Sequence, residues 1–156
     1  MVIHPLKRRP HRPRPEQRFL GELSLTLARA HEFCGNSRRT LAMMLAGAIQ
    51  GPVFWILPGW SPERLHPEGM LGFANPGRFT FVGPGRGEDI LWCMEEALRS
   101  GAVPLVVAEL PMPAGLTPVR RLHLAAETGA EEGKYRPLGV MLTAGDGGSL
   151  DRKSVV

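Results

Sequence analysis

The chain has 156 residues, 43% of them hydrophobic and 22% charged, with a formal net charge of +4. This length is typical of one domain with a substantial core, and no apolar run approaches the roughly 18 residues that a membrane-spanning helix needs. No apolar segment follows the N-terminal charges, which argues against a secretory signal.

Residues 1–20 form a basic, proline-rich arm. Pro5, Pro10, Pro13 and Pro15 interrupt it, so we expect it to be disordered or polyproline-like rather than helical. A basic arm can neutralise the phosphates of nucleic acid, although the same composition is typical of a solvated tail or linker. No aromatic side chain for base stacking lies within the cluster. The candidate nucleic-acid contacts are Lys7, Arg8, Arg9, Arg12, Arg14 and Arg18.

In the next segment an apolar stretch, a glycine and a helical pattern follow one another, as they do around a phosphate-binding loop. The apolar residues 23–34 lead to Gly35, and an amphipathic helix is expected to begin at Thr40. A P-loop places G-x-x-x-x-G-K-[ST] at such a junction, where backbone N–H groups and the Lys bind phosphates and the Ser or Thr holds Mg²⁺. Here the second glycine and the lysine are missing and the loop is shorter. The pattern predicts a nucleotide-hydrolase fold that serves another purpose.

Short apolar runs then alternate with helical patterns. The expected buried strands are residues 53–57, 79–82, 103–110 and 138–143, each set off by glycine, proline or both. The expected helices are residues 88–99, ended by Gly101, and 117–127, with Thr117 as N-cap and Pro118 in the first position. Apolar strands that alternate with helices are typical of a parallel sheet covered on both faces. We therefore predict an α/β fold with a mainly parallel sheet of about five strands.

The two cysteines, Cys34 and Cys93, lie in apolar segments far apart in the sequence. This placement predicts reduced core cysteines in a cytoplasmic protein rather than a disulfide or a metal site. The five histidines show no metal-ligand spacing with either cysteine. We expect no cofactor and no metal.

Three segments resemble RecA recombinases. Residues 31–35 resemble the strand that enters the RecA P-loop. Residues 99–109 resemble the helix end and the Walker B strand, and residues 81–91 resemble the strand and helix that come just before them in RecA. The degenerate loop and residues 55–65 are most similar to the ImuA group, which is also labelled SulA-like or RecA-like. The resemblance covers residues 21–145 and implies a RecA-like three-layer domain with helices on both faces of the sheet.

The resemblance also implies a function. The ImuA group accompanies the ImuB protein and an error-prone polymerase in bacterial SOS mutagenesis. The chain is thus expected to be a non-catalytic accessory factor that contacts RecA, a translesion polymerase complex or both, with weak DNA binding as a further property and no association with membranes. Two alternatives stay open: a RecA-like ATPase with an unusual nucleotide site, and a DNA-binding module that uses the basic arm.

Carried over residue by residue, the RecA nucleotide site is incomplete. Arg38 and Arg39 are nearest to the missing P-loop lysine, and a planar guanidinium is a poor replacement for a lysine point charge. Thr40 matches the Mg²⁺-binding threonine, although a helix N-cap is its ordinary role. Glu109 falls at the expected Walker B acid, where it would hold a metal-bound water. A glutamate at the exposed end of a strand is an equally ordinary interpretation of this position. With Gly35, these residues make up the degenerate nucleotide site, and no catalytic residue is assigned.

The loop that follows the expected strand at residues 53–57, residues 58–65, is the candidate partner interface. RecA-type ATPases keep a water-activating Glu there, but this chain has Pro58-Gly59-Trp60, and Glu63 comes several residues later. Trp55 is expected in the core, whereas a tryptophan that follows Pro-Gly in a loop favours an interface. The candidate interface residues are Trp60, Glu63 and Arg64. Alternatively, Trp60 packs as a lid over the vacated nucleotide site.

The end of the chain, residues 146–156, differs in character from the rest. A glycine-rich stretch precedes the final DRKSVV, where a RecA-like core would continue into further strands. We expect a truncated reading frame whose last residues did not evolve to fold.

Overall fold

Parallel strands form the centre of the computed structural model, which describes residues 13–147 and 153–155. The strands are β3 (Arg29–Cys34), β4 (Val53–Ile56), β5 (Phe79–Val82), β6 (Leu105–Glu109), β7 (Leu138–Thr143) and the short β8 (Lys153–Val155). Their order is β5-β4-β6-β7-β3-β8, and every neighbouring pair is parallel. The predicted parallel sheet is confirmed.

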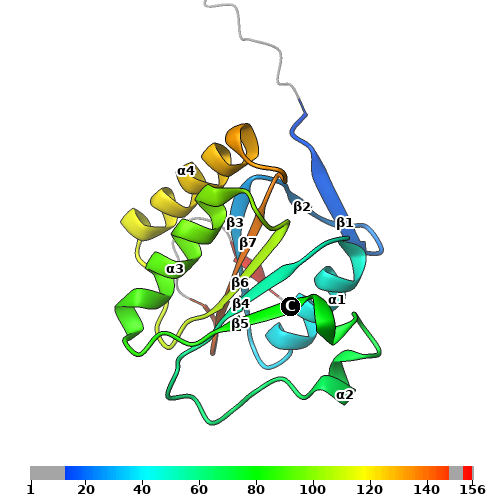
Figure 1. Ribbon diagram of the computed structural model, residues 1–156, viewed down its shortest axis with the longest axis vertical. Coiled ribbons are helices and arrows are strands. Elements are labelled where there is room, and N and C mark those ends of the chain that lie inside the picture. The colour runs from blue at the N-terminus through cyan, green and yellow to red at the C-terminus, as the bar shows by residue number, and fades with distance from the viewer. Residues whose placement is uncertain (1–12, 148–152, 156) are drawn as a thin grey trace, which may run out of the picture.

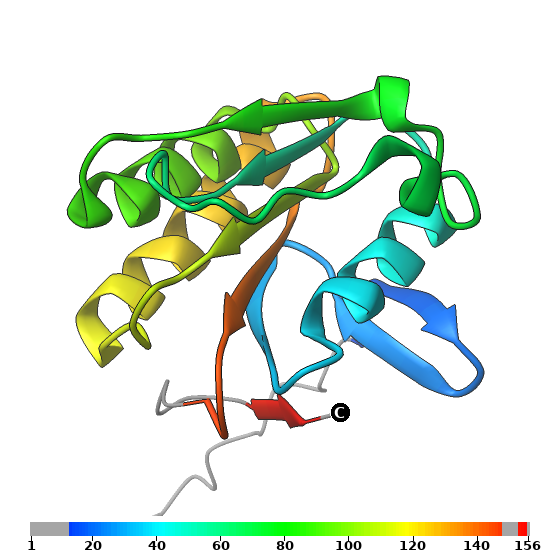
Figure 2. The same ribbon diagram turned by 90° about the horizontal axis from the view of Figure 1, so that it is seen from below.

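Helices cover both faces of this sheet (Figures 1 and 2). One face carries α1 (Arg38–Ala48), the short α2 (Pro67–Met70) and the 3₁₀ turn η1 (Pro76–Arg78). The other face carries α3 (Gly87–Ser100) and α4 (Leu116–Glu132). Among the described residues, no helix combines the length and the apolarity needed to cross a bilayer.

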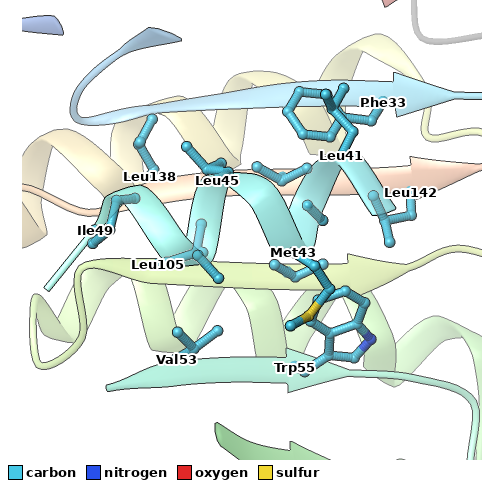
Figure 3. Close-up of a cluster of buried hydrophobic side chains, with 14 of the residues drawn as sticks. Phe33, Leu41, Met43, Leu45, Ile49, Val53, Trp55, Leu105, Leu138 and Leu142 are labelled. Atoms are coloured by element: carbon cyan, nitrogen blue, oxygen red, sulfur yellow. The ribbon is translucent and has the colours of Figure 1, made fainter. Parts of the chain in front are cut away.

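Alternate residues of the central strands feed two separate cores. Leu105 and Val107 of β6 pack under α1, and Val106 and Ala108 pack under α3 and α4. Figure 3 shows the α1 side, where Trp55 is fully buried, as the sequence predicts. Because both faces of the sheet are covered, β4, β6 and β7 are apolar at nearly every position.

Two glycines bring α3 and α4 into backbone contact. Gly101 ends α3 with a φ of 58°, the left-handed conformation expected of a glycine after a helix. A Cβ atom at Gly129 of α4 would lie 2.0 Å from the carbonyl oxygen of Leu98. No side chain fits at that crossing.

One arginine closes the C-terminal end of α1. The guanidinium of Arg78 donates to the carbonyl oxygens of Gly51, Ala46 and Ile49, at 2.7, 3.0 and 2.6 Å. Carbonyls at a helix end lack partners within the helix. Arg78 supplies partners from the turn before β5.

The N-terminal part differs from expectation. Residues 23–34 form two strands rather than one, because the chain turns at Ala28, which has a φ of 56°. β2 (Leu23–Thr26) pairs antiparallel with β1 (Glu16–Leu20), so the prediction of a disordered arm is wrong for residues 16–20. Phe19 of β1 stacks on Phe33 with ring centroids 6.1 Å apart, which ties the hairpin to the core. Residues 1–12, including Lys7, Arg8, Arg9 and Arg12, lie outside the described residues.

Three further elements differ from the sequence predictions. β5 is an edge strand rather than a buried one, and Phe81 is 44% exposed. α4 begins at Leu116 with Gly115 as its N-cap, so Thr117 lies inside the first turn. The backbone of β8 pairs with β3, although the end of the chain was expected to have no place in the fold.

Candidate functional site

The loops that follow β3, β4 and β6 meet at the carboxyl end of the parallel strands. Ligands usually bind at this end of an open α/β sheet. The loops enclose a pocket of about 280 Å³ with an apolar wall and several charged groups. Its lining residues are Arg38, Arg39, Pro58, Trp60, Ser61, Pro62, Glu63, Glu109, Leu110, Pro111 and Leu142.

Arg39 lies between two carboxylates in this pocket. Its Nε pairs with Glu109 at the end of β6, and its Nη1 lies 2.9 Å from Glu63 Oε2 in the loop after β4. The Glu109 side chain is 12% exposed and the Glu63 side chain 71% exposed. Burial alone lowers the pKa of Arg39, but the hydrogen bonds and charges of Glu109 and Glu63 outweigh it and raise that pKa. The structure therefore brings three residues of the predicted sites into one ion-paired group.

The loop between β3 and α1 depends on a glycine. Gly35 has a φ of 92°, a conformation that side-chain-bearing residues rarely adopt. Arg38 Nη1 donates to the Gly35 carbonyl oxygen at 2.8 Å, which ties the start of α1 to this turn.

The prediction that Thr40 opens α1 as its N-cap is wrong. The helix begins at Arg38, its N-cap is Ser37, and no side-chain capping bond is made. Thr40 is an exposed residue inside the first turn. β3 ends at Cys34 and α1 begins at Arg38, so the loop has only the three residues 35–37 and the helix starts two residues before Thr40.

Trp60 lies at the mouth of the pocket and is 55% exposed. Gly59 N donates to the Pro84 carbonyl oxygen at 2.9 Å, which joins the loop after β4 to the loop after β5. The indole Cη2 atom of Trp60 would lie 3.6 Å from a Cβ atom at Gly87. Trp60 thus rests on the start of α3 with much of its ring in solvent.

The remaining candidate residues lie apart or point elsewhere. Arg64 donates to the Ser61 carbonyl oxygen at 2.7 Å and does not line the pocket. Arg18 is an exposed residue of β1. Arg14 lines a second pocket of about 290 Å³ with Arg29 and Arg136, at the amino end of β3. The structure does not bring Arg14 or Arg18 to the pocket that Arg39 and Trp60 line.

The sequence reasoning missed two features of this end of the sheet. Leu110, Pro111 and Leu142 form the apolar wall of the pocket, and their position directly after or within the strand ends could have indicated it. Glu32 is fully buried on β3 and accepts a hydrogen bond from Thr143 Oγ1 at 2.7 Å. The signal for it was an acidic residue directly before the apolar Phe33 and Cys34 at the end of the strand.

Comparisons with known proteins point to a fold. No protein-family model and no curated protein sequence matches the chain. The crystal structure of SulA from Pseudomonas aeruginosa is similar, with a TM-score of 0.56, 18% sequence identity, and coverage of 74% of this chain and 98% of that chain. At this identity the similarity shows the fold alone. The chain has a SulA-like α/β fold.

Proposed function

We propose that this chain is a non-catalytic, RecA-like accessory factor in SOS-induced error-prone DNA repair. It acts in the cytoplasm through contacts with RecA, a translesion polymerase complex or both. The similarity to SulA supports the fold on which this proposal depends, because the ImuA group that the sequence resembles is also labelled SulA-like.

The ion pairs of Arg39 carry the non-catalytic part of the proposal. A nucleotide-hydrolysing site needs its cation for the phosphates and its carboxylates for Mg²⁺ and water. Here Arg39, which is nearest to the missing P-loop lysine, is held by Glu109 and Glu63. These are the two carboxylates nearest to the expected Walker B acid and the expected water-activating glutamate. A phosphate that binds Arg39 would have to displace at least Glu63, and among the described residues no lysine lines the pocket to take the place of Arg39.

The exposure of Trp60 supports a role in binding protein. Tryptophan and arginine dominate the binding energy of protein interfaces, and Trp60 lies beside the Arg38 and Arg39 pocket with more than half of its surface in solvent. A lid over a nucleotide site would be largely buried. We therefore assign Trp60 to a partner surface that includes Glu63 and the neighbouring Arg64.

The test compares two exposed tryptophans. Trp60→Ala should weaken association with purified RecA or with the ImuB–polymerase complex by about 2 kcal/mol, or roughly 30-fold, and leave the melting temperature nearly unchanged. Trp92→Ala is the matched control, because Trp92 is 58% exposed on α3 and does not line the pocket. Biolayer interferometry gives the affinities. A complex that tolerates Trp60→Ala, or no complex with either partner, would contradict the proposal.

A further inference from the structure

The two carboxylates that hold Arg39 differ in how easily they can be replaced. Glu109 is 12% exposed and anchored at the end of β6, whereas Glu63 is 71% exposed in a loop. An exposed ion pair contributes only about 0–1 kcal/mol. A carboxylate from another molecule could therefore replace Glu63 at Arg39 at small cost, but could not replace Glu109.

Arg38 adds donors to the same pocket. Among the described residues its guanidinium makes one hydrogen bond, from Nη1 to the Gly35 carbonyl oxygen, and no ion pair. A guanidinium carries five N–H donors. Arg38 thus keeps donors for an acceptor that enters the pocket beside Arg39.

Apart from Ser61, the uncharged part of the lining is apolar. Trp60, Leu110 and Leu142 lie around the two arginines, together with three prolines of the adjoining loops. A volume of about 280 Å³ lies at the lower limit of typical small-molecule sites. Glu109 and Glu63 would also repel a polyphosphate. The pocket is suited to a ligand with one negative charge and an adjoining apolar group.

We propose that this pocket binds an exposed segment of a protein partner in which an acidic residue adjoins an apolar one. The acidic carboxylate displaces Glu63 from Arg39 and accepts from Arg38, and the apolar side chain packs on Trp60 and the Leu110 wall. This inference rests on the proposed function, since it names the chemistry of the partner at the same surface. Charge complementarity selects the occupant: a basic or neutral segment would leave Arg38 without an anion.

The test uses a minimal probe and the full chain labelled with ¹⁵N. N-acetyl-glutamyl-leucine amide should shift the Trp60 indole resonance and the backbone amides of residues 38, 39 and 59–63 in NMR titrations. The matched glutaminyl dipeptide should bind at least threefold more weakly. Glu63→Gln should strengthen binding of the glutamyl dipeptide several-fold, Arg38→Gln should weaken it, and Glu68→Gln, on α2 outside the pocket, should leave it unchanged.

Each other outcome has a definite meaning. Equal binding of the two dipeptides, shifts confined to other surfaces, or a response of these resonances to ATP alone would overturn the inference. Because the dipeptide experiment contains no cellular partner, its result is independent of whether RecA or the polymerase complex binds. If those partners bind through Trp60 while the dipeptide does not shift these resonances, the proposed function stands and this inference fails.

Discussion

The guanidinium of Arg39 pairs with the carboxylate of Glu109 across the carboxyl end of the sheet. Arg39 lies in the first turn of α1 and Glu109 is the last residue of β6, so the pair joins the turn after β3 to the end of a strand two places away in the sheet. The Arg39 side chain thereby spans the pocket between the loop after β3 and the loop after β6.

ATP should bind no more tightly than about 1 mM, near −4 kcal/mol, and its hydrolysis should be undetectable. The reason is that Arg39 is neutralised and the loop lacks both the lysine and the second glycine. Titration with a fluorescent ATP analogue gives the affinity. Micromolar binding that Arg38→Ala or Thr40→Ala abolishes would favour the ATPase alternative.

Arg39→Ala should lower the free energy of unfolding by about 1–2 kcal/mol, because it leaves the nearly buried Glu109 without its counter-ion. Glu63→Ala should cost less than about 0.5 kcal/mol, since Glu63 is exposed to solvent. Urea denaturation of both variants measures the difference. Equal losses would mean that the pair with Glu63 accounts for the whole contribution of Arg39 and that the pair with Glu109 adds nothing to stability.

Gly129→Ala should destabilise the protein by roughly 2–3 kcal/mol and lower its melting temperature by roughly 5–10 °C. Its added methyl group would overlap the Leu98 carbonyl oxygen and force α3 and α4 apart. Gly69→Ala is the control, since no atom lies within 4 Å of a Cβ atom there. Differential scanning calorimetry should show a change only for Gly129→Ala, and a Gly129→Ala protein as stable as the wild type would refute the close helix contact.

Cys93 should react slowly with iodoacetamide near neutral pH. Burial, with a smaller contribution from Asp89, raises the pKa of its thiol above the ordinary value. The thiolate is the reactive form, so its alkylation rate should rise with pH and reach its midpoint at a higher pH than that of a free cysteine peptide. Because the folded state favours the neutral thiol, any stability that Cys93 contributes is present below the ordinary thiol pKa and is lost as the pH rises above it.

Mass-spectrometric mapping of alkylated peptides separates Cys93 from the buried Cys34. Asp89→Asn should move the midpoint for Cys93 downward, since it removes the negative charge that disfavours the thiolate. A Cys93 midpoint equal to that of the free peptide would disprove the shift.

The strands of the sheet could be predicted from the sequence because burial on both faces leaves an apolar run that glycine and proline delimit. β7 has the predicted bounds, and β4 lies within its predicted range. The β1–β2 hairpin could not be predicted, because the chain turns into β3 at Ala28, a residue with no turn preference. The exposure of β5 depends on strand order, which local patterns do not encode.

The candidate site could be predicted only in part. The resemblance to the RecA nucleotide site indicated Arg39 and Glu109. Glu63 and Trp60 were indicated by the loop that replaces the RecA catalytic glutamate, at the end of the sheet where loops of parallel strands converge. The pairing of Arg39 with Glu109 could not be predicted, because the two residues are 70 positions apart in the sequence. They meet only because the order of the strands makes their loops neighbours. Thr40 shows the limit of motif matching: its expected place at the helix start suggested a helix cap, but α1 begins at Arg38 and Ser37 is its N-cap.

The exposed edge of the sheet has a consequence for how the molecule behaves in concentrated solution. Within the described part of the chain, β5 pairs only with β4, so its outer backbone groups face no other strand there. The strand is four residues long, and Pro76 and Pro84 lie close to its two ends. A proline cannot donate the hydrogen bond that would lengthen a ladder. Pairing of β5 with a strand of a second molecule should therefore form few hydrogen bonds, although Phe81 is exposed on it. This short edge limits edge-to-edge association of copies of the chain in concentrated solution.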